Sequence, residues 1–224
     1  MRLTVRLFAG LRDRFGRERL EVELPEGATA GDLLAALELA PRSCIVAVDR
    51  EYVGADRVLA AGSEVAVIPP VSGGAPGADG APGADRAPGS GGAVALVRIS
   101  EAPLEPAALL AAVRDPRAGA VLLFEGVTRD VSHLDYEAYA EMAEPVLRRI
   151  AVEEAERHGL CAVAVEHRVG RVELSEPSVL VAVSAPHRAE AYAGSRALID
   201  RLKAEAPIWK REEGEWVPGT LPGS

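Results

Sequence analysis

A repeated hexapeptide near the middle of the chain is the feature that most constrains its fold. Residues 75–92 read Ala-Pro-Gly-Ala-Asp-Gly, Ala-Pro-Gly-Ala-Asp-Arg and Ala-Pro-Gly-Ser-Gly-Gly, with no large apolar side chain. Such a segment cannot bury enough surface to offset the entropy lost on ordering. We therefore expect a flexible linker with an r.m.s. span of about 25 Å, which separates one domain at residues 1–74 from a second at residues 93–224.

The composition narrows the class of protein. A net charge of −9 over 224 residues disfavours a nucleic-acid binder, which normally has a basic surface. Cys44 and Cys161 sit in separate apolar runs, so we expect buried free thiols in a reducing compartment. There is no signal-peptide core, no apolar run near the ~20 residues that span a bilayer, and no clustered His/Cys pattern for a metal. We expect a soluble, cytoplasmic protein without membrane or nucleic-acid partners.

The first domain shows the order strand, strand, helix, strand, strand. Thr29 with Asp32 is a plausible helix start, an apolar stripe follows, and Pro41 is expected to end the helix. Apolar alternation or apolar runs predict strands at residues 2–8, 20–24, 44–48 and 64–68. About 70 residues in this order fit a β-grasp (ubiquitin-like) fold, in which the helix packs across a mixed sheet.

The second domain mixes helices and strands, as α/β or α+β. Gly159 is expected to cap one helix, and Pro186 to stand at the start of another that ends before Pro207. Residues 104–113, 140–158 and from Pro186 to about 204 are the predicted helices, and residues 120–124, 161–167 and 179–184 the predicted strands. We expect the strand at 120–124 to be buried. The whole chain is therefore an α+β protein.

Each of the two domains carries its own set of short motifs. Residues 1–74 contain Leu7-Phe8-Ala9-Gly10-Leu11 and the ending Pro69-Pro70-Val71-Ser72-Gly73-Gly74, and through these motifs they resemble the small sulfur-carrier subunit of molybdopterin synthase. Residues 93–224 resemble the large catalytic subunit through five motifs in order: Phe124-Glu125-Gly126-Val127-Thr128-Arg129, Tyr136-Glu137-Ala138-Tyr139, His167-Arg168-Val169-Gly170, Ser184-Ala185-Pro186-His187-Arg188 and Leu202-Lys203-Ala204-Glu205-Ala206-Pro207-Ile208-Trp209-Lys210. The resemblance implies a natural fusion whose second domain has a hammerhead-type α/β fold.

The resemblance also implies a reaction. The family is a sulfurtransferase that converts cyclic pyranopterin monophosphate into the dithiolene molybdopterin, with sulfur carried as a thiocarboxylate on a terminal glycine and no cofactor. Here that glycine is Gly74, and Gly73 and Gly74 have no side chains to obstruct threading into a confined site. Because Ala75 follows Gly74, a protease must cut this bond before an adenylating enzyme can load sulfur. The alternative is that the diglycine merely opens the glycine-rich linker.

Four basic residues are the candidates for the chemistry of a phosphorylated substrate, which calls for cations and hydrogen-bond donors. His187 and Arg188 stand where a helix begins, so free backbone N–H groups add to an anion site. By resemblance, Lys203 and Lys210 are the catalytic lysines, and Lys210 is the better candidate for direct chemistry. The plainer alternatives are a basic pair on a solvated helix turn and ordinary exposed lysines.

Arg129 is a further candidate, because it follows a predicted strand and precedes a loop. By resemblance it binds the substrate or the carrier tail, and the alternative is a surface arginine paired with Asp130. Only residues 130–135 separate it from Tyr136, where the family usually has a longer, polar, glycine-containing loop. A lid or partner contact made through that loop is therefore in doubt.

The remaining motif residues are expected to be structural. His167-Arg168-Val169-Gly170 should end a strand and enter a turn, with binding of the carrier tail by Arg168 as the alternative. The segment 136–139 is expected to serve strand packing, and His133 and His158 to lie on the surface.

The spacing of Arg188 and Lys203 predicts a second subunit. They lie fifteen residues apart on one predicted helix, hence about 22 Å apart along its axis. Both cannot touch a small pterin from the same chain, so they serve different subsites or a second chain completes the site. Since the family resembled here uses a dimer of large subunits, we predict a homodimer through the second domain.

Two other functions compete with this hypothesis. The first domain could act only as a non-enzymatic carrier or docking module, with the second domain served by a separate carrier. Cleavage after Gly74 distinguishes these cases. A phosphate-ester hydrolase is disfavoured, because the sequence shows neither a metal motif nor an evident nucleophile.

Overall fold

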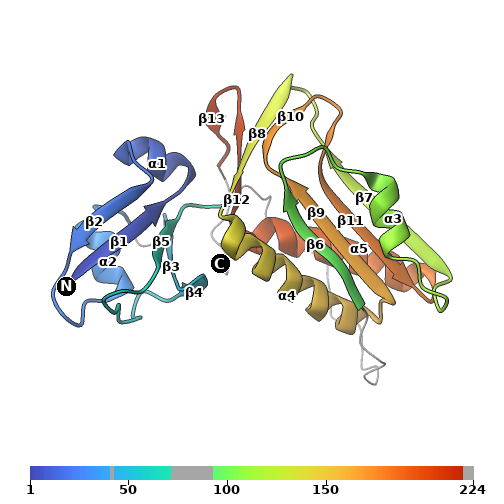
Figure 1. Ribbon diagram of the computed structural model, residues 1–224, viewed down its shortest axis with the longest axis horizontal. Coiled ribbons are helices and arrows are strands. Elements are labelled where there is room, and N and C mark those ends of the chain that lie inside the picture. Colours follow the sequence, from blue (N-terminus) through green and yellow to red (C-terminus); the bar gives the residue numbers. More distant parts are fainter. Residues whose placement is uncertain (41–42, 72–92, 219–224) are drawn as a thin grey trace.

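The computed structural model describes residues 1–40, 43–71 and 93–218, and these form two parts that lie against each other (Figure 1). The N-terminal part is coloured blue to teal, and the C-terminal part green to red. Gly73, Gly74 and the predicted linker lie outside the described residues. No helix in the described part of the chain is long and apolar enough to cross a membrane.

The N-terminal part is a mixed sheet crossed by a helix, which confirms the predicted β-grasp fold. Its strand order is β2-β1-β5-β3-β4, with β1 and β5 parallel and the other pairs antiparallel. The strands are β1 Arg2–Leu7, β2 Arg19–Glu23, β3 Ile45–Val48, β4 Glu51–Val53 and β5 Val65–Ile68. Leu33 and Leu34 of α2 (Ala30–Ala36) are buried in the core that also contains Val5 and Val67.

The helix α2 begins as predicted and ends earlier. Thr29 and Asp32 form a capping box, which confirms the predicted start. The helix stops at Ala36 with Leu37 as its cap, and Glu38 already has a left-handed φ of 55°. The chain therefore leaves the helix before Pro41, which lies outside the described residues. The short helix α1 (Ala9–Phe15) and the three-residue strand β4 were not predicted.

The C-terminal part contains two four-stranded sheets. The first has the order β6-β9-β11-β7, and the second β10-β8-β12-β13. These strands are β6 Ala93–Ser100, β7 Ala120–Val127, β8 His133–Ala138, β9 Ala162–Arg168, β10 Gly170–Glu173, β11 Pro177–Ala185, β12 Ile208–Glu212 and β13 Glu215–Trp216. The structure confirms the predicted mixture of helices and strands, although β6, β10, β12 and β13 were not predicted.

Helices cover both faces of the first sheet. Alternation along β9 turns Val163 and Val165 toward the core under α4 (Ala140–His158) and α5 (Arg188–Glu205), and Ala162 and Ala164 toward α3 (Pro106–Ala112). The predicted limits of α4 are confirmed, and Gly159 caps it with a φ of 60°. Helix α5 starts two residues after Pro186, with His187 as its N-cap.

The expectation of a buried strand at residues 120–124 was wrong. β7 is the edge strand of the first sheet, and Val121 and Val127 are nearly half exposed. An apolar run alone does not distinguish a central strand from an edge strand, because that depends on which neighbours pair with it. Cys44 and Cys161 are buried free thiols, as predicted.

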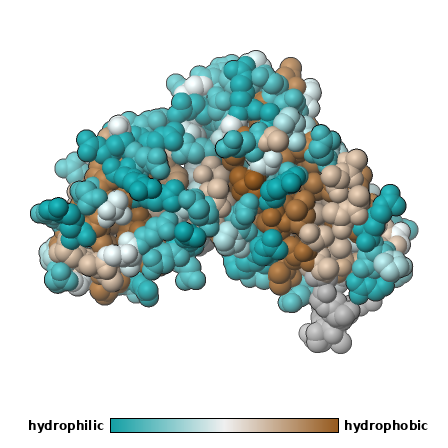
Figure 2. Space-filling view, in the orientation of Figure 1, coloured by the Kyte–Doolittle hydropathy of each residue, from teal (hydrophilic) through white to brown (hydrophobic). Residues whose placement is uncertain are grey.

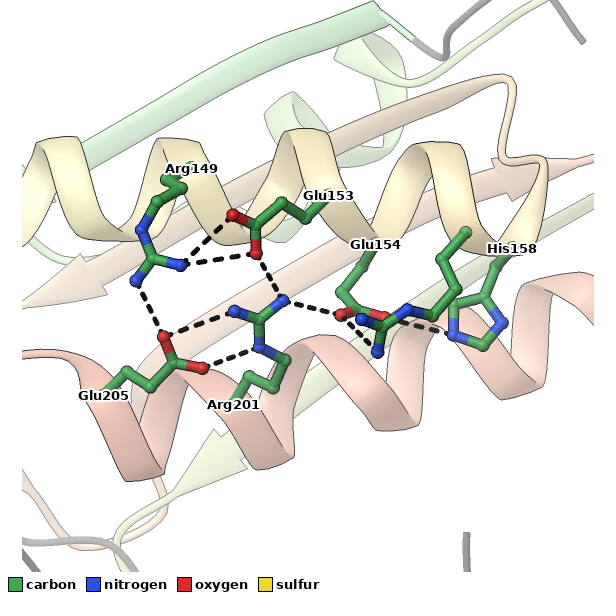
Figure 3. A network of polar contacts seen from close by, with 7 residues as sticks. Arg149, Glu153, Glu154, His158, Arg201 and Glu205 are labelled. Carbon is green, nitrogen blue, oxygen red and sulfur yellow. Dashed lines mark hydrogen bonds and ion pairs between the residues drawn. The ribbon is translucent and has the colours of Figure 1, made fainter. Parts of the chain in front are cut away.

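An ion-pair network joins α4 to α5 (Figure 3). Arg201 contacts Glu153, Glu154 and Glu205, with N···O distances of 2.6–2.7 Å, and Arg149 also contacts Glu205 at 2.7 Å. Glu154 is fully buried, and burial alone would raise its pKa. Hydrogen bonds with His158 and Arg201 outweigh this effect and hold the pKa of Glu154 below its ordinary value.

Two of the surface expectations need correction. His158 is only partly exposed, because its Nε2 lies 3.1 Å from the buried carboxylate of Glu154. His133 is also partly buried at the start of β8, 3.6 Å from Asp135. Both histidines therefore face carboxylates that lie within four residues of them in the sequence.

Aromatic side chains join the two parts of the chain. Phe8 stacks on Tyr139 and Trp209, with ring centroids 4.6 and 5.3 Å apart. Tyr139 donates a hydrogen bond to Glu64, and the Arg6 guanidinium lies 4.5 Å from the centre of the Tyr139 ring. Tyr139, expected to serve strand packing, is therefore a central contact between the two parts.

Polar contacts surround this aromatic stack. Asp13 of α1 accepts hydrogen bonds from Trp216 at 2.7 Å and Arg211 at 2.8 Å. Arg12 pairs with Glu137 at 2.7 Å. The contact thus has an aromatic centre and a charged border.

The outer surface differs between the two parts. Figure 2 shows a mostly hydrophilic surface on this face of the N-terminal part, with apolar residues gathered over the C-terminal part.

Candidate active site

A cavity of about 370 Å³ lies within the C-terminal part, between the two sheets and the end of α5. Three of the predicted site residues line it: Arg129, Lys203 and Lys210. The other lining residues are Gly126, Val127, Asp130, Leu134, Tyr136, Leu147, Val165, His167, Ser178, Val179, Ile199, Leu202, Ala206, Ile208 and Glu212. Lys203 and Lys210 are the two lysines of the sequence, so every lysine side chain of this protein lies at one cavity.

Different elements position the two lysines. Lys203 is exposed in the last turn of α5, whose placement against α4 is held by the Arg201 network. Lys210 is half-buried in β12 and lies directly opposite Tyr136 of β8 in the antiparallel register. Residues paired across a sheet present their side chains on the same face. The fold therefore brings a helix end and a strand to the same cavity.

Arg129 reaches the cavity from its rim. It stands two residues after the end of β7, its side chain is 87% exposed, and its Nε lies 3.8 Å from Asp130. Asp130 has a left-handed φ of 64°, and β8 begins at His133, so the connection between the two strands is short. Arg129 thus lines the cavity and is also a surface arginine paired with Asp130, as the alternative interpretation of the sequence expected.

Neutral polar groups lie among these charges. Ser178 donates a hydrogen bond to the carbonyl oxygen of Gly126 at 3.1 Å. Burial raises the pKa of Tyr136, while its hydrogen bond with Ser178 acts in the opposite direction. The phenol therefore stays neutral at pH 7. Among the described residues, no group of three or more His, Cys, Asp or Glu side chains is placed to hold a metal ion.

His167 is a lining residue that sequence reasoning treated as structural. Its Nδ1 lies 2.8 Å from the carbonyl oxygen of Arg168, and its ring packs edge-on against Tyr136. Burial lowers the pKa of His167 to about 4, with a further lowering from the charge of Lys203, so the ring is neutral at pH 7. The alternation of Val165 and His167 along β9 was the available signal, because both side chains line the cavity.

His187 and Arg188 do not join the cavity. They are exposed at the N-terminus of α5, whereas Lys203 lies in its last turn. The structure confirms that Arg188 and Lys203 share one helix, with about 22 Å between them along its axis. The side chain of Arg168, the alternative tail ligand, is paired with Glu176 at 2.7 Å.

The chain before Gly73 runs next to the strand that carries Lys210. Trp209 Nε1 donates a hydrogen bond to the carbonyl oxygen of Pro69 at 3.2 Å. Val71, the last described residue before the diglycine, is fully buried in the core cluster that contains Trp209. Gly73 and Gly74 themselves lie outside the described residues.

Comparisons with known proteins match each of the two parts to a family. Residues 99–205 match the model of the MoaE protein family, and residues 5–74 match that of the ThiS family. The molybdopterin synthase catalytic subunit of Halalkalibacterium halodurans is 42% identical over 133 residues, covering 55% of this chain and 85% of the relative.

Two solved structures share the fold of the C-terminal part. Molybdopterin synthase from Staphylococcus aureus matches with a TM-score of 0.50 and 35% identity, covering 55% of this chain and 93% of that chain. Molybdopterin cofactor biosynthesis protein E from Burkholderia multivorans matches with a TM-score of 0.53 and 36% identity, covering 58% and 92%. The chain belongs to the family of molybdopterin synthase catalytic subunits, enzymes of molybdopterin biosynthesis, and carries a ThiS-family β-grasp domain ahead of the catalytic part.

Proposed function

We propose that this chain is a sulfurtransferase that converts cyclic pyranopterin monophosphate into dithiolene molybdopterin, with sulfur carried as a thiocarboxylate on Gly74. One observation carries the proposal. The chain leading to the diglycine is buried against Trp209, the neighbour of Lys210, and Lys210 lines a cavity together with Lys203 and Arg129.

Chain geometry supports delivery of the tail to this cavity. Gly74 follows the buried Val71 by three residues, and three residues of extended chain span at most about 11 Å. Gly73 and Gly74 bring no side chains into a narrow path. A carrier part that is docked on its own catalytic part can therefore present its tail to the site of the same chain.

The cations suit an anionic substrate and an anionic tail. Lys203, Lys210 and Arg129 can donate hydrogen bonds but cannot accept them, and preorganised donors stabilise negative charge that develops during reaction. In our proposal Lys210 acts closest to the chemistry, because its strand register pairs it with Tyr136, which lines the same cavity. Lys203 and Arg129 then bind the phosphate or the tail.

The sulfur transfer requires two steps before catalysis. The Gly74-Ala75 peptide bond is hydrolysed by a protease, and an adenylating enzyme then activates the freed carboxylate for replacement of one oxygen by sulfur. At the site, the sulfur forms a bond to a substrate carbon while a carbon–oxygen bond at that carbon breaks, and water then cleaves the bond between the glycine carbonyl carbon and sulfur to return the carboxylate. Two such transfers supply the two sulfur atoms. We place the domain boundaries accordingly at residues 74 and 93.

The intact mass of protein purified from its native host tests the proposal. We expect a fragment ending at Gly74 in which one sulfur replaces one oxygen, together with a fragment beginning at Ala75. Full-length protein that makes molybdopterin with no separate carrier present would contradict it. Full-length protein that is active only with an added carrier would favour the alternative, in which the N-terminal part is a docking module.

A further inference from the structure

The imidazole of His167 has one nitrogen fixed and the other unused. A carbonyl oxygen can only accept a hydrogen bond, so Nδ1, which lies 2.8 Å from the Arg168 oxygen, must carry the proton. The neutral ring then has its lone pair on Nε2. Within the described residues Nε2 has no hydrogen-bond partner, and the ring lines the cavity.

The ring is also held in one orientation. Tyr136 packs against it with centroids 5.2 Å apart and an interplanar angle of 69°. The backbone that accepts from Nδ1 is anchored by the pairing of Arg168 with Glu176 at 2.7 Å. An imidazole that is fixed from two sides can accept a hydrogen bond from one direction only. It loses little conformational entropy when a ligand binds.

In the described part of the chain, none of the charged side chains that line the cavity is an acceptor suited to an anionic ligand. Its three cations only donate, and the carboxylates of Asp130 and Glu212 would repel a phosphate. Asp130 is moreover 86% exposed at the rim and paired with Arg129. A neutral imidazole accepts a hydrogen bond without adding negative charge.

We propose that His167 Nε2 accepts a hydrogen bond from an N–H group of the heterocyclic substrate and so fixes the orientation of its ring beside the two lysines. The proposal rests on the function proposed above, because it takes the substrate to be an anionic nitrogen heterocycle. It assigns to His167 a role in binding, and it moves no proton.

Two substitutions test the roles of the two ring nitrogens of His167 independently. In His167→Asn the side-chain amide lies near the position of Nδ1, so it can still donate to the Arg168 carbonyl but offers no acceptor at Nε2. In His167→Gln the amide reaches the position of Nε2 and supplies an acceptor there. A merely structural role of the Nδ1 bond predicts that Asn is tolerated better than Gln, and our proposal predicts the reverse.

The measurement is the Kd of cyclic pyranopterin monophosphate for the full chain, by isothermal titration calorimetry, with Tm recorded for each variant. We expect His167→Asn to weaken binding roughly tenfold, the loss of one hydrogen bond, and His167→Gln to stay within about threefold of wild type. Asn binding as tightly as wild type, or both variants binding equally weakly, would overturn the role of Nε2. Failure of the wild-type chain to bind the substrate would instead remove the proposed function, and this inference with it.

Discussion

At the scale of single residues, the use of lysine separates this cavity from the rest of the molecule. Arginine supplies the other cationic side chains, and the two lysines of the sequence both line the cavity. Arginine stays charged at all accessible pH values, whereas lysine can exchange a proton. The placement of lysine therefore coincides with the place where proton transfer would be needed.

Two substitutions of Lys210 should distinguish the contribution of its positive charge from its contribution to proton transfer. We expect Lys210→Ala to lower molybdopterin formation by at least about 100-fold with an unchanged Tm, since the residue is only half-buried in β12. Lys210→Arg keeps the positive charge and should retain substrate binding without restoring turnover. Rates are measured with the thiocarboxylated carrier in excess. Wild-type turnover in Lys210→Ala would remove this residue from the mechanism.

His167 should make stability depend on pH. Its pKa is about 4 in the folded chain, against an ordinary value of 6.5, so between these values the unfolded state binds a proton that the folded state does not. The contribution of His167 to the free energy of unfolding is fully present above pH 6.5 and is lost as the pH falls toward 4. At pH 5 the free energy of unfolding is lower by about 2 kcal/mol for this reason. Denaturant unfolding at pH 7 and pH 5 measures the loss, and the drop should be smaller by that amount in His167→Asn. An equal drop in both chains would contradict the assignment.

At the scale of elements, the position of Lys203 depends on how α5 is fixed to α4. Arg201 is two residues before Lys203 and binds carboxylates of both helices, including the fully buried Glu154. The same network reaches the N-terminal part, because Tyr52 donates a hydrogen bond to the carbonyl oxygen of Glu205 at 2.9 Å. One arginine thus holds the helix that presents a lysine to the cavity.

Removal of Arg201 should be costly. We expect Arg201→Ala to lower the free energy of unfolding by about 3 kcal/mol, because it removes a partner of a buried carboxylate. Arg196→Ala is the matched control on the same helix, since Arg196 pairs with Asp200 in an exposed ion pair and should cost less than about 1 kcal/mol. Urea unfolding measures both variants. Equal effects would show that the network contributes no more than a surface ion pair.

At the scale of the whole molecule, the docking of the two parts depends on a few aromatic side chains. Phe8 is buried between Tyr139 and Trp209, although it comes from the N-terminal part and they come from the C-terminal part. We expect Phe8→Ala to weaken this contact by about 3 kcal/mol and to raise the radius of gyration in small-angle X-ray scattering. Tyr192→Ala, which removes an exposed aromatic ring from α5, should leave the scattering unchanged. A compact Phe8→Ala chain would show that the polar border alone holds the two parts together.

The separation of Arg188 from the cavity leads to a prediction about assembly. If a second copy supplies His187 and Arg188 to each site, Arg188→Ala and Lys210→Ala chains should each be inactive, because each lacks one half of a composite site. Mixing the two variants under exchange conditions should restore part of the activity, since a mixed dimer has one complete site. An active monomer, or an inactive mixture that has formed mixed dimers, would contradict a shared site.

The sequence by itself determined the two folded parts and most of the long elements. The limits of α4, the capping box at Thr29 and the cap at Gly159 follow from side-chain spacing and local backbone preference, and the structure has all three. It also indicated that Arg188 and Lys203 share a helix too long for both to reach one small ligand. These features depend on neighbours along the chain, which a sequence displays directly.

Only the tertiary structure decided which side chains meet. The edge position of β7, the contact of Phe8 with Tyr139 and Trp209, and the place of His167 in the cavity each depend on residues far apart in sequence. The neutrality of His167 likewise follows from burial and from Lys203, which arrives on another element. Burial and charge are properties of a packed neighbourhood, so the family resemblance of the sequence could name the two lysines that line the cavity but not the histidine that lies beside them.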